Sequence, residues 1–121
     1  MKKKKLLIVD DEPDVAQFLK RRLERNNFEV FTAENGQKCL EIAAGEEVDL
    51  IILDIIMPLM DGYEVIKRLR GNPYTGRIPI VMYSIRKETE SIFKSMELGS
   101  IDYVIKPVKF EALLKVIKRY V

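Results

Sequence analysis

Hydrophobic residues along this chain follow two alternating patterns. Short continuous apolar runs, such as those at 6–9 and 50–53, are typical of strands buried on both faces of a parallel sheet. The segments between the runs place apolar residues three or four positions apart, which is the spacing of a helix with one buried face. The pattern predicts strands near residues 5–10, 28–32, 49–54, 78–83 and 101–105. It predicts helices near residues 14–26, 35–45, 62–70, 87–98 and 109–120.

Several predicted helices carry start and stop signals. Pro13 suits the start of the first helix, and Gly45 and Gly99 suit the ends of the second and the fourth. The apolar face of the first helix, which also includes Arg22, consists of Val15, Phe18, Leu19 and Leu23. The apolar residues of the fourth are Ile92, Phe93 and Met96. Strands that alternate with helices predict an α/β domain whose parallel sheet is covered by helices on both faces.

Length and composition limit the kind of protein. The chain has 121 residues, of which 47% are apolar and 33% charged, with a net charge of +2. These values are typical of a single globular domain, expected over residues 1–121, and argue against direct nucleic acid binding. No apolar run reaches the ~18 residues of a membrane span, and Asp10 interrupts the N-terminal run too early for a signal peptide. Because Cys39 is the single cysteine, the chain cannot form an internal disulfide, and we expect a cytoplasmic protein. Because no apolar span is present in the sequence, we expect no membrane binding.

Charged residues follow three of the predicted strands at the point where each strand ends. Asp10 and Asp11 come after the first strand, Asp54 after the third and Lys106 after the fifth. Ligands bind at the carboxyl ends of the strands in open α/β sheets, so these side chains are expected at one edge. Three carboxylates at one place repel one another unless a cation lies between them, and Mg²⁺ prefers oxygen ligands. The alternative is that Asp10 and Asp11 only cap the first helix and Asp54 is a turn residue.

Four segments of the chain resemble the receiver domain of two-component response regulators. They read Leu-Ile-Val-Asp-Asp-Glu-Pro at 7–13, Leu-Asp-Ile-Ile-Met-Pro-Leu-Met-Asp-Gly at 53–62, Ile-Pro-Ile-Val-Met-Tyr-Ser at 78–84 and Asp-Tyr-Val-Ile-Lys-Pro at 102–107. These segments agree with the family in order and spacing. The resemblance implies a flavodoxin-like (βα)5 fold, doubly wound, whose five-stranded parallel sheet has the strand order 2-1-3-4-5.

The resemblance also implies a phosphorylation site with a bound metal ion. Asp54 corresponds to the phosphoacceptor. Mg²⁺, or Mn²⁺ in its place, is implied to be held by Asp11, Asp54 and the backbone carbonyl of Ile56, with Asp10 often acting through water. Lys106, followed by a cis peptide bond, is implied to neutralise the phosphoryl group from the opposite side. Such a chain is a phosphoacceptor with intrinsic Mg²⁺-dependent autophosphorylation and autodephosphorylation, not an enzyme that converts a metabolite.

Two further positions match the switch residues of the family. Ser84 ends the fourth strand, where a hydroxyl bonds the phosphoryl group, and Tyr103 lies in the fifth strand, where an aromatic ring then turns inward. These movements of the two side chains are expected to alter the face made by the fourth helix, the fifth strand and the fifth helix, and so to relay the signal. The residues alone leave open that Ser84 is an ordinary strand-end residue and Tyr103 an aromatic of the core.

The resemblance implies protein partners on both sides of this switch. A histidine kinase or a histidine phosphotransfer protein is implied upstream. An effector protein or an output domain is implied downstream, and a phosphorylation-dependent homodimer is a further expectation. Both a stand-alone regulator and the receiver of a longer protein fit the sequence.

Two residues depart from the family pattern. Ile85 follows the switch hydroxyl, where relatives often carry alanine, and its side chain is expected to narrow access to Asp54. Ile56 is apolar where many relatives carry a polar residue, so it has no side chain that orients an attacking water. Both departures bear on the rates of phosphorylation and hydrolysis, and not on the chemistry itself.

Three other functions match parts of the pattern. A phosphatase of the haloacid dehalogenase type needs a second aspartate two positions after its nucleophile, where this chain has Ile56. A flavin- or nucleotide-binding protein needs glycine, serine or threonine after the first strand, where residues 10–14 are mostly acidic. The remaining alternative is a pseudo-receiver, which acts as an interaction module without phosphorylation, and only Ile85 favours it.

Overall fold

The computed structural model describes residues 2–121 as an alternating series of strands and helices. The strands are β1 (Lys5–Val9), β2 (Glu29–Ala33), β3 (Leu50–Leu53), β4 (Ile80–Ser84) and β5 (Asp102–Ile105). The helices are α1 (Pro13–Glu24), α2 (Gly36–Gly45), α3 (Gly62–Arg70), α4 (Thr89–Leu98) and α5 (Phe110–Tyr120). All the predicted elements are present in the predicted order, with ends that agree within two residues. No helix among the described residues is both long and apolar enough to cross a membrane.

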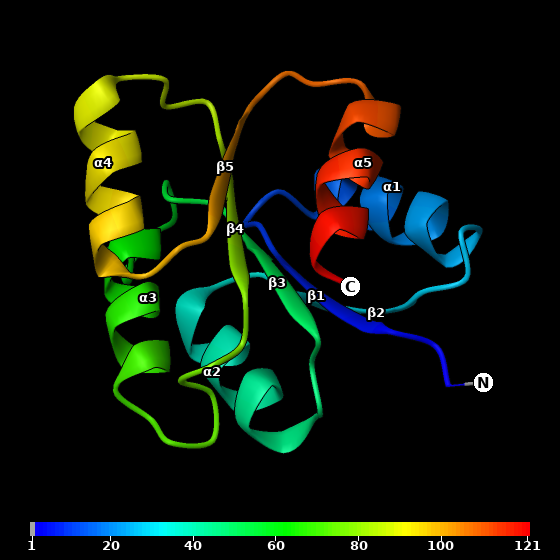
Figure 1. Ribbon diagram of the computed structural model, residues 1–121, viewed down its shortest axis with the longest axis horizontal. Coiled ribbons are helices and arrows are strands. Elements are labelled where there is room, and N and C mark those ends of the chain that lie inside the picture. Colours follow the sequence, from blue (N-terminus) through cyan, green and yellow to red (C-terminus); the bar gives the residue numbers. More distant parts are fainter. Residues whose placement is uncertain (1) are drawn as a thin grey trace.

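The strands form one parallel sheet in the order β2-β1-β3-β4-β5, which confirms the implied order. β1 lies in the interior of the sheet, with Val9 opposite Ala33 of β2 and Leu53 of β3. α1 and α5 cover one face of the sheet, and α2, α3 and α4 cover the other (Figure 1). This is the doubly wound, flavodoxin-like α/β arrangement, in which the carboxyl ends of all strands meet at one edge.

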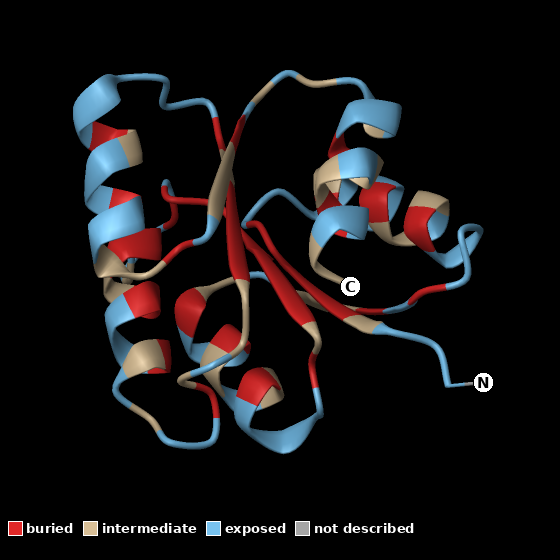
Figure 2. Ribbon diagram, viewed as in Figure 1, coloured by how far each residue is buried: buried red, intermediate tan, exposed pale blue. Residues whose placement is uncertain are grey.

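Two apolar layers, one on each face of the sheet, form the core. Alternate residues of β1 point to opposite faces, so Leu6 and Ile8 pack toward α1 and α5, whereas Leu7 and Val9 pack toward α2 and α3. Buried residues are concentrated along the strands and on the inner sides of the helices (Figure 2). Since complete burial of one Leu or Ile stabilises a fold by about 2 kcal/mol, these layers hold the strand ends in place.

Cys39, the single cysteine, is part of the core. It lies on α2 in the same apolar layer as Leu7 and is fully buried. Burial raises the pKa of its thiol to about 12. The thiolate is the reactive form of cysteine, so Cys39 acts here as a packed apolar residue.

α1 buries a face that differs in part from the predicted one. The residues that it buries are Ala16, Leu19 and Leu23. Phe18, predicted to lie on the buried face, is 53% exposed. The guanidinium carbon of Arg22 lies 5.6 Å from the centre of the Phe18 ring and 4.5 Å from that of Phe110 on α5. Phe18 therefore lies at the surface, next to Arg22 of the same helix, while the other apolar residues of α1 face the core.

α4 packs on the sheet through small polar side chains. Its buried residues are Ser91 and Ser95, and the Ser95 hydroxyl donates a hydrogen bond to the carbonyl oxygen of Ser91 at 2.9 Å. Of its predicted apolar residues, Ile92 is partly buried, whereas Phe93 is 65% and Met96 46% exposed. Two of the three therefore face outward, and Leu98 is the residue of this helix that packs against the apolar layer. α4 consequently buries little apolar area, which makes it one of the weakly held elements of the fold.

Candidate functional site

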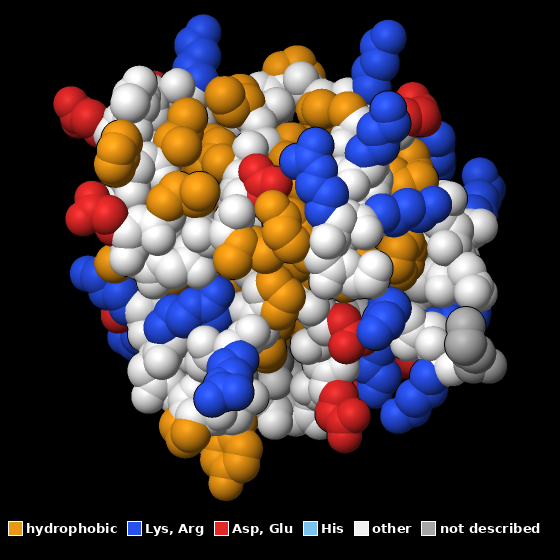
Figure 3. Space-filling view, viewed as in Figure 1, with side chains coloured by type: hydrophobic (Ala, Val, Ile, Leu, Met, Phe, Trp, Pro, Cys, Tyr) orange, Lys and Arg blue, Asp and Glu red, His pale blue; other side chains and the backbone are white. Residues whose placement is uncertain are grey.

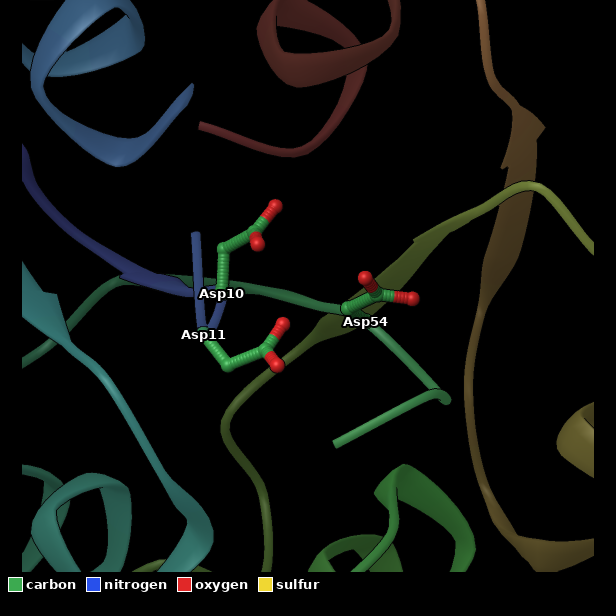
Figure 4. A group of neighbouring side chains, drawn as sticks. All are labelled: Asp10, Asp11 and Asp54. Carbon is green, nitrogen blue, oxygen red and sulfur yellow. The ribbon is translucent and has the colours of Figure 1, made fainter. Parts of the chain in front are cut away.

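Two neighbouring strands bring the three predicted carboxylates to one edge of the sheet. Asp10 follows β1 and Asp54 follows β3. The backbone N–H of Asp10 donates to the Ala33 carbonyl at 3.1 Å, and that of Asp54 donates to the Val9 carbonyl at 3.1 Å, so each continues the strand ladder. Asp11 is exposed, yet one oxygen from each of the three carboxylates lies within 4.8 Å of the others (Figure 4). The acids that the sequence places at strand ends therefore meet in the structure.

Asp10 and Asp54 are buried, and each accepts hydrogen bonds that compensate its charge. Asp10 is 3% exposed, and its Oδ1 accepts from the backbone N–H of Glu12 at 2.9 Å. Asp54 is 7% exposed, and its Oδ1 accepts from the backbone N–H of Ile56 at 3.3 Å. The Nζ of Lys106 donates to the Oδ2 of Asp10 at 2.8 Å and to that of Asp54 at 3.2 Å. One lysine thus bridges the two buried carboxylates.

Lys106 reaches this place from the strand at the edge of the sheet. It follows β5, its backbone N–H donates to the Ser84 carbonyl at 2.9 Å, and its peptide bond to Pro107 is cis, as the resemblance implies. Burial by itself lowers the pKa of Lys106, but hydrogen bonds and charge from Asp10 and Asp54 outweigh burial and raise the pKa above its ordinary value. The ammonium group is therefore fully charged at neutral pH.

The ring of Tyr83 lies next to the same ammonium group. The Nζ of Lys106 is 4.8 Å from the centre of this ring, within the range of a cation–π contact. Burial raises the pKa of the Tyr83 phenol, while the positive charge of Lys106 opposes that rise. Nothing in the sequence pattern singles out Tyr83, because a contact between side chains of two adjacent strands leaves no local signal.

A small open pocket lies over the acidic cluster. Its volume is about 190 Å³, and the residues that line it are Asp11, Glu12, Asp54, Ile56, Ile85 and Lys106. Ile85 is 63% exposed and forms part of the rim. The expectation that Ile85 lies near the mouth of the pocket is confirmed. Asp54 is the buried carboxylate that this pocket reaches, so a small anion that enters it meets Asp54 and Lys106 together.

Ser84 and Tyr103 both contact the backbone of Arg86, which follows β4. Ser84 is buried, and its Oγ accepts from the backbone N–H of Arg86 at 3.3 Å. Tyr103 is half-buried, and its hydroxyl donates to the Arg86 carbonyl at 2.6 Å. Burial is the main cause that raises the pKa of the Tyr103 phenol. The two predicted switch residues are therefore connected through one loop residue, which the sequence pattern did not reveal.

The loop after Asp54 folds back tightly against β3. The backbone N–H of Gly62, the first residue of α3, donates to the Ile55 carbonyl at 2.8 Å. A Cβ at position 62 would collide with the carbonyl oxygen of Asp54 and come within 2.8 Å of the Ile55 Cα. Since both obstacles are backbone atoms, neither can turn aside as a flexible side chain does, and glycine is required here for the close approach.

We predict that Gly62→Ala lowers the free energy of unfolding by about 1–3 kcal/mol, because overpacking forces the backbone around Asp54 to shift. Urea denaturation measures the change. Gly45→Ala is the matched control, since a Cβ at position 45 meets nothing within 4 Å. Gly45 ends α2, where alanine is expected to leave the stability unchanged or raise it by up to about 1 kcal/mol. Equal stabilities for the two variants would contradict the required close approach.

The acidic cluster has the chemistry of a site for a hard cation. Asp10, Asp11 and Asp54 offer carboxylate oxygens, which Mg²⁺ prefers, and the cluster opens to solvent through Asp11. Lys106 neutralises part of the charge of the two buried members. The exposed third carboxylate remains close to both, so a divalent cation would relieve the remaining repulsion. The residues present therefore fit a magnesium ion.

Comparison with known proteins identifies the family to which the chain belongs. The family model of the response regulator receiver domain matches residues 6–118. This match covers nearly the whole chain, so the chain belongs to the response regulator receiver domain family. The family consists of signalling domains, and the fold and the strand-end acids described above agree with it.

Individual relatives show the same relationship. The chain is 41% identical over 108 residues to a probable cyclic di-GMP phosphodiesterase of Vibrio cholerae, covering 89% of this chain and 24% of that protein. It is 40% identical over 104 residues to the alkaline phosphatase synthesis transcriptional regulatory protein PhoP of Bacillus subtilis, covering 86% of this chain and 42% of that protein. The chain thus spans less than half the length of these curated relatives.

A solved structure confirms the fold class. The chemotaxis protein CheY4 of Vibrio cholerae superposes with a TM-score of 0.94 at 31% sequence identity. The superposition covers 99% of this chain and 100% of that chain. A receiver domain of a histidine kinase from Syntrophus aciditrophicus is similar as well, with a TM-score of 0.87 at 33% identity over 97% of this chain and 89% of that chain.

Proposed function

We propose that this chain is a phosphorylation-dependent signalling switch in which Asp54 accepts a phosphoryl group. One observation carries the proposal: the buried Asp54 carboxylate opens into a small pocket and touches the Lys106 ammonium, with two further carboxylates beside it. An anionic phosphoryl group at this place meets a fixed cation. Membership of the receiver family supports the same assignment. The upstream partner that we propose is a histidine kinase or a histidine phosphotransfer protein.

The transfer forms one bond and breaks another. An oxygen of Asp54 bonds to phosphorus while the bond from phosphorus to the donor breaks, and the donor atom, a histidine nitrogen or an acetate oxygen, keeps the electron pair. Such transfer depends mainly on positioning and on charge neutralisation. Lys106, already 3.2 Å from Asp54, supplies one positive charge to the phosphoryl oxygens.

A metal ion would complete the charge neutralisation. The groups that we propose as its ligands are Asp10, Asp11, Asp54 and the backbone carbonyl of Ile56. When bound, Mg²⁺ stabilises negative charge on phosphoryl oxygens. Asp11 is the exposed member of the acidic cluster. Lys106 forms its ion pairs with Asp10 and Asp54, so the Asp11 carboxylate can bind the metal without breaking either pair.

The signal is proposed to travel from Asp54 through Ser84 and Tyr103. The Ser84 hydroxyl accepts one long hydrogen bond from Arg86, which leaves its own proton available to a phosphoryl oxygen. The Tyr103 hydroxyl is anchored to the Arg86 carbonyl. A movement of Ser84 toward phosphorylated Asp54 therefore changes the anchor of Tyr103. The response is a population shift between two packings of this loop and of the weakly held α4.

The surface next to these residues is proposed to bind the downstream partner. Hydrophobic side chains gather over α4 and β5 (Figure 3). The exposed apolar residues there are Phe93, Met96, Ile101 and Ile105. Apolar groups on this α4–β5–α5 face suit an effector protein, an output domain or a second phosphorylated copy of the chain. We propose that phosphorylation and the binding of this partner take place in the cytoplasm.

Phosphorylation of the wild-type chain tests the proposal. The chain is incubated with acetyl phosphate and Mg²⁺, and its intact mass is measured. One added phosphoryl group is expected, and none when a chelator replaces Mg²⁺. A chain that gains no phosphoryl group under any of these conditions would be a pseudo-receiver, and the proposal would be withdrawn.

We predict that Ile85→Ala speeds both phosphorylation by acetyl phosphate and the later loss of the phosphoryl group. The Ile85 side chain lines the mouth of the pocket, so it restricts both the small donor and the attacking water. Ile101→Ala is the control, because Ile101 is an exposed isoleucine that precedes β5 and does not line this pocket. Rates that stay within about twofold, which is below ~0.5 kcal/mol of barrier, would contradict the steric role of Ile85.

A further inference from the structure

Tyr83 lies at a strand position from which its aromatic ring reaches Lys106. It lies in β4, where Val81 packs toward α1 and α5, and the alternation of the strand turns Tyr83 to the same face. Lys106 follows β5, the strand that pairs with β4. The Nζ of Lys106 therefore comes to 4.8 Å from the ring centre. This contact involves residues 83 and 106, which are far apart in the sequence, and it exists because the two strands are neighbours.

The ring differs in kind from the other two groups that hold the ammonium. Asp10, at 2.8 Å, and Asp54, at 3.2 Å, are charged acceptors that share the one ammonium group. The hydrogen bond to Asp54, the carboxylate that the lysine is proposed to serve, is the longer of the two. Tyr83 attracts the positive charge through the face of its ring and takes no part in the hydrogen bonds. The lysine side chain is 13% exposed, so water competes little with this contact.

We propose that Tyr83 is a positioning residue that holds Lys106 ready for the phosphorylation of Asp54. This inference rests on the proposed function of Asp54. A lysine side chain has many rotamers, so the fraction of time that it spends aligned depends on each contact that restrains it. Loss of the ring lowers this fraction and with it the rate of phosphoryl transfer. Tyr83 acts through Lys106 and does not touch the reacting atoms.

Two substitutions at position 83 separate the role of the aromatic ring from that of the phenol hydroxyl. Tyr83→Leu removes the ring, and Tyr83→Phe keeps it. With acetyl phosphate, Tyr83→Leu is expected to be phosphorylated about fivefold more slowly, which is ~1 kcal/mol converted at about 1.4 kcal/mol per tenfold. Tyr83→Phe is expected to stay within about twofold of the wild type. The affinity for Mg²⁺ should not change in either variant, because the three carboxylates remain.

The matched control lies on the same side of the sheet. Phe110 packs in the same apolar layer as Tyr83, but its ring lies against Arg22. Phe110→Leu should therefore leave the rate of phosphorylation unchanged. Tyr83→Met serves as a second ring-free variant if Tyr83→Leu does not fold.

A second measurement reports the contact without any phosphorylation. In the proton NMR spectrum, the ring current of Tyr83 is expected to displace the ε-methylene signals of Lys106 in the wild type and in Tyr83→Phe, and not in the ring-free variants. Absence of this displacement in the wild type, or wild-type rates in the ring-free variants, would overturn the role of Tyr83. If the wild type takes up no phosphoryl group, the proposed function fails, and the NMR comparison still decides whether the contact exists.

Discussion

Replacing Asp54 with asparagine is expected to abolish phosphorylation of the chain by acetyl phosphate. Asparagine has nearly the same size and keeps an oxygen for the hydrogen bond from Lys106, so the fold should persist. Its amide, however, has no anionic oxygen that attacks phosphorus to form an acyl phosphate. Intact-mass measurement should show one added phosphoryl group on the wild type and none on Asp54→Asn.

Asp61→Asn is the matched control for this substitution. Asp61 caps α3, where its Oδ1 accepts from the backbone N–H of Glu64 at 3.0 Å. Asparagine caps a helix as well as aspartate does, so Asp61→Asn should be fully phosphorylated. Equal labelling of Asp54→Asn and the wild type would assign the phosphoryl group to another residue. It would remove the basis of the proposed switch.

Mg²⁺ is expected to raise the melting temperature of the wild type and to leave that of Asp11→Ala unchanged. A ligand at 100 times its dissociation constant stabilises the state that binds it by about 2.7 kcal/mol. For a domain of this size, that corresponds to a rise on the order of 10 °C. Asp11 supplies the exposed oxygens of the acidic cluster, so its removal takes away a ligand without disturbing the buried pairs with Lys106. Thermal unfolding with and without Mg²⁺ measures both values.

The same substitution is expected to have the opposite effect when no metal is bound. Lys106 pairs with Asp10 and Asp54, so Asp11 adds negative charge to a cluster that is already acidic. Asp11→Ala should therefore stabilise the metal-free chain slightly, by at most about 1 kcal/mol. Asp14→Ala, which changes an acid in the first turn of α1 outside the cluster, should keep the full Mg²⁺-dependent rise. A rise that persists in Asp11→Ala would place the cation elsewhere.

The strands and the acids at their ends were predictable from local sequence. The runs at 6–9 and 50–53 are apolar at every position, which indicates strands buried on both faces, and the change to aspartate marks where each strand ends. Strand order was not predictable in this way, because no local pattern records which strands pair. The resemblance to receiver domains implies the order, and the structure confirms it.

For the helices, the local sequence pattern predicts the element but not always which of its residues are buried. Apolar spacing predicts α4 as a helix, but the residues that this helix buries are Ser91 and Ser95. An apolar stripe predicts burial only when the neighbouring elements have room for it. Beside β5, α4 approaches the sheet through small side chains, and Phe93 remains outside.

The number and order of the elements, and the residues that supply the acids, follow from the amino-acid sequence, because these features depend on neighbours a few positions apart along the chain. Which carboxylates pair with Lys106 depends instead on how the folded chain brings the strands together. The same is true of the contact between the Tyr83 ring and the ammonium group. These contacts join residues at the carboxyl ends of four different strands, so they arise only when the sheet is assembled.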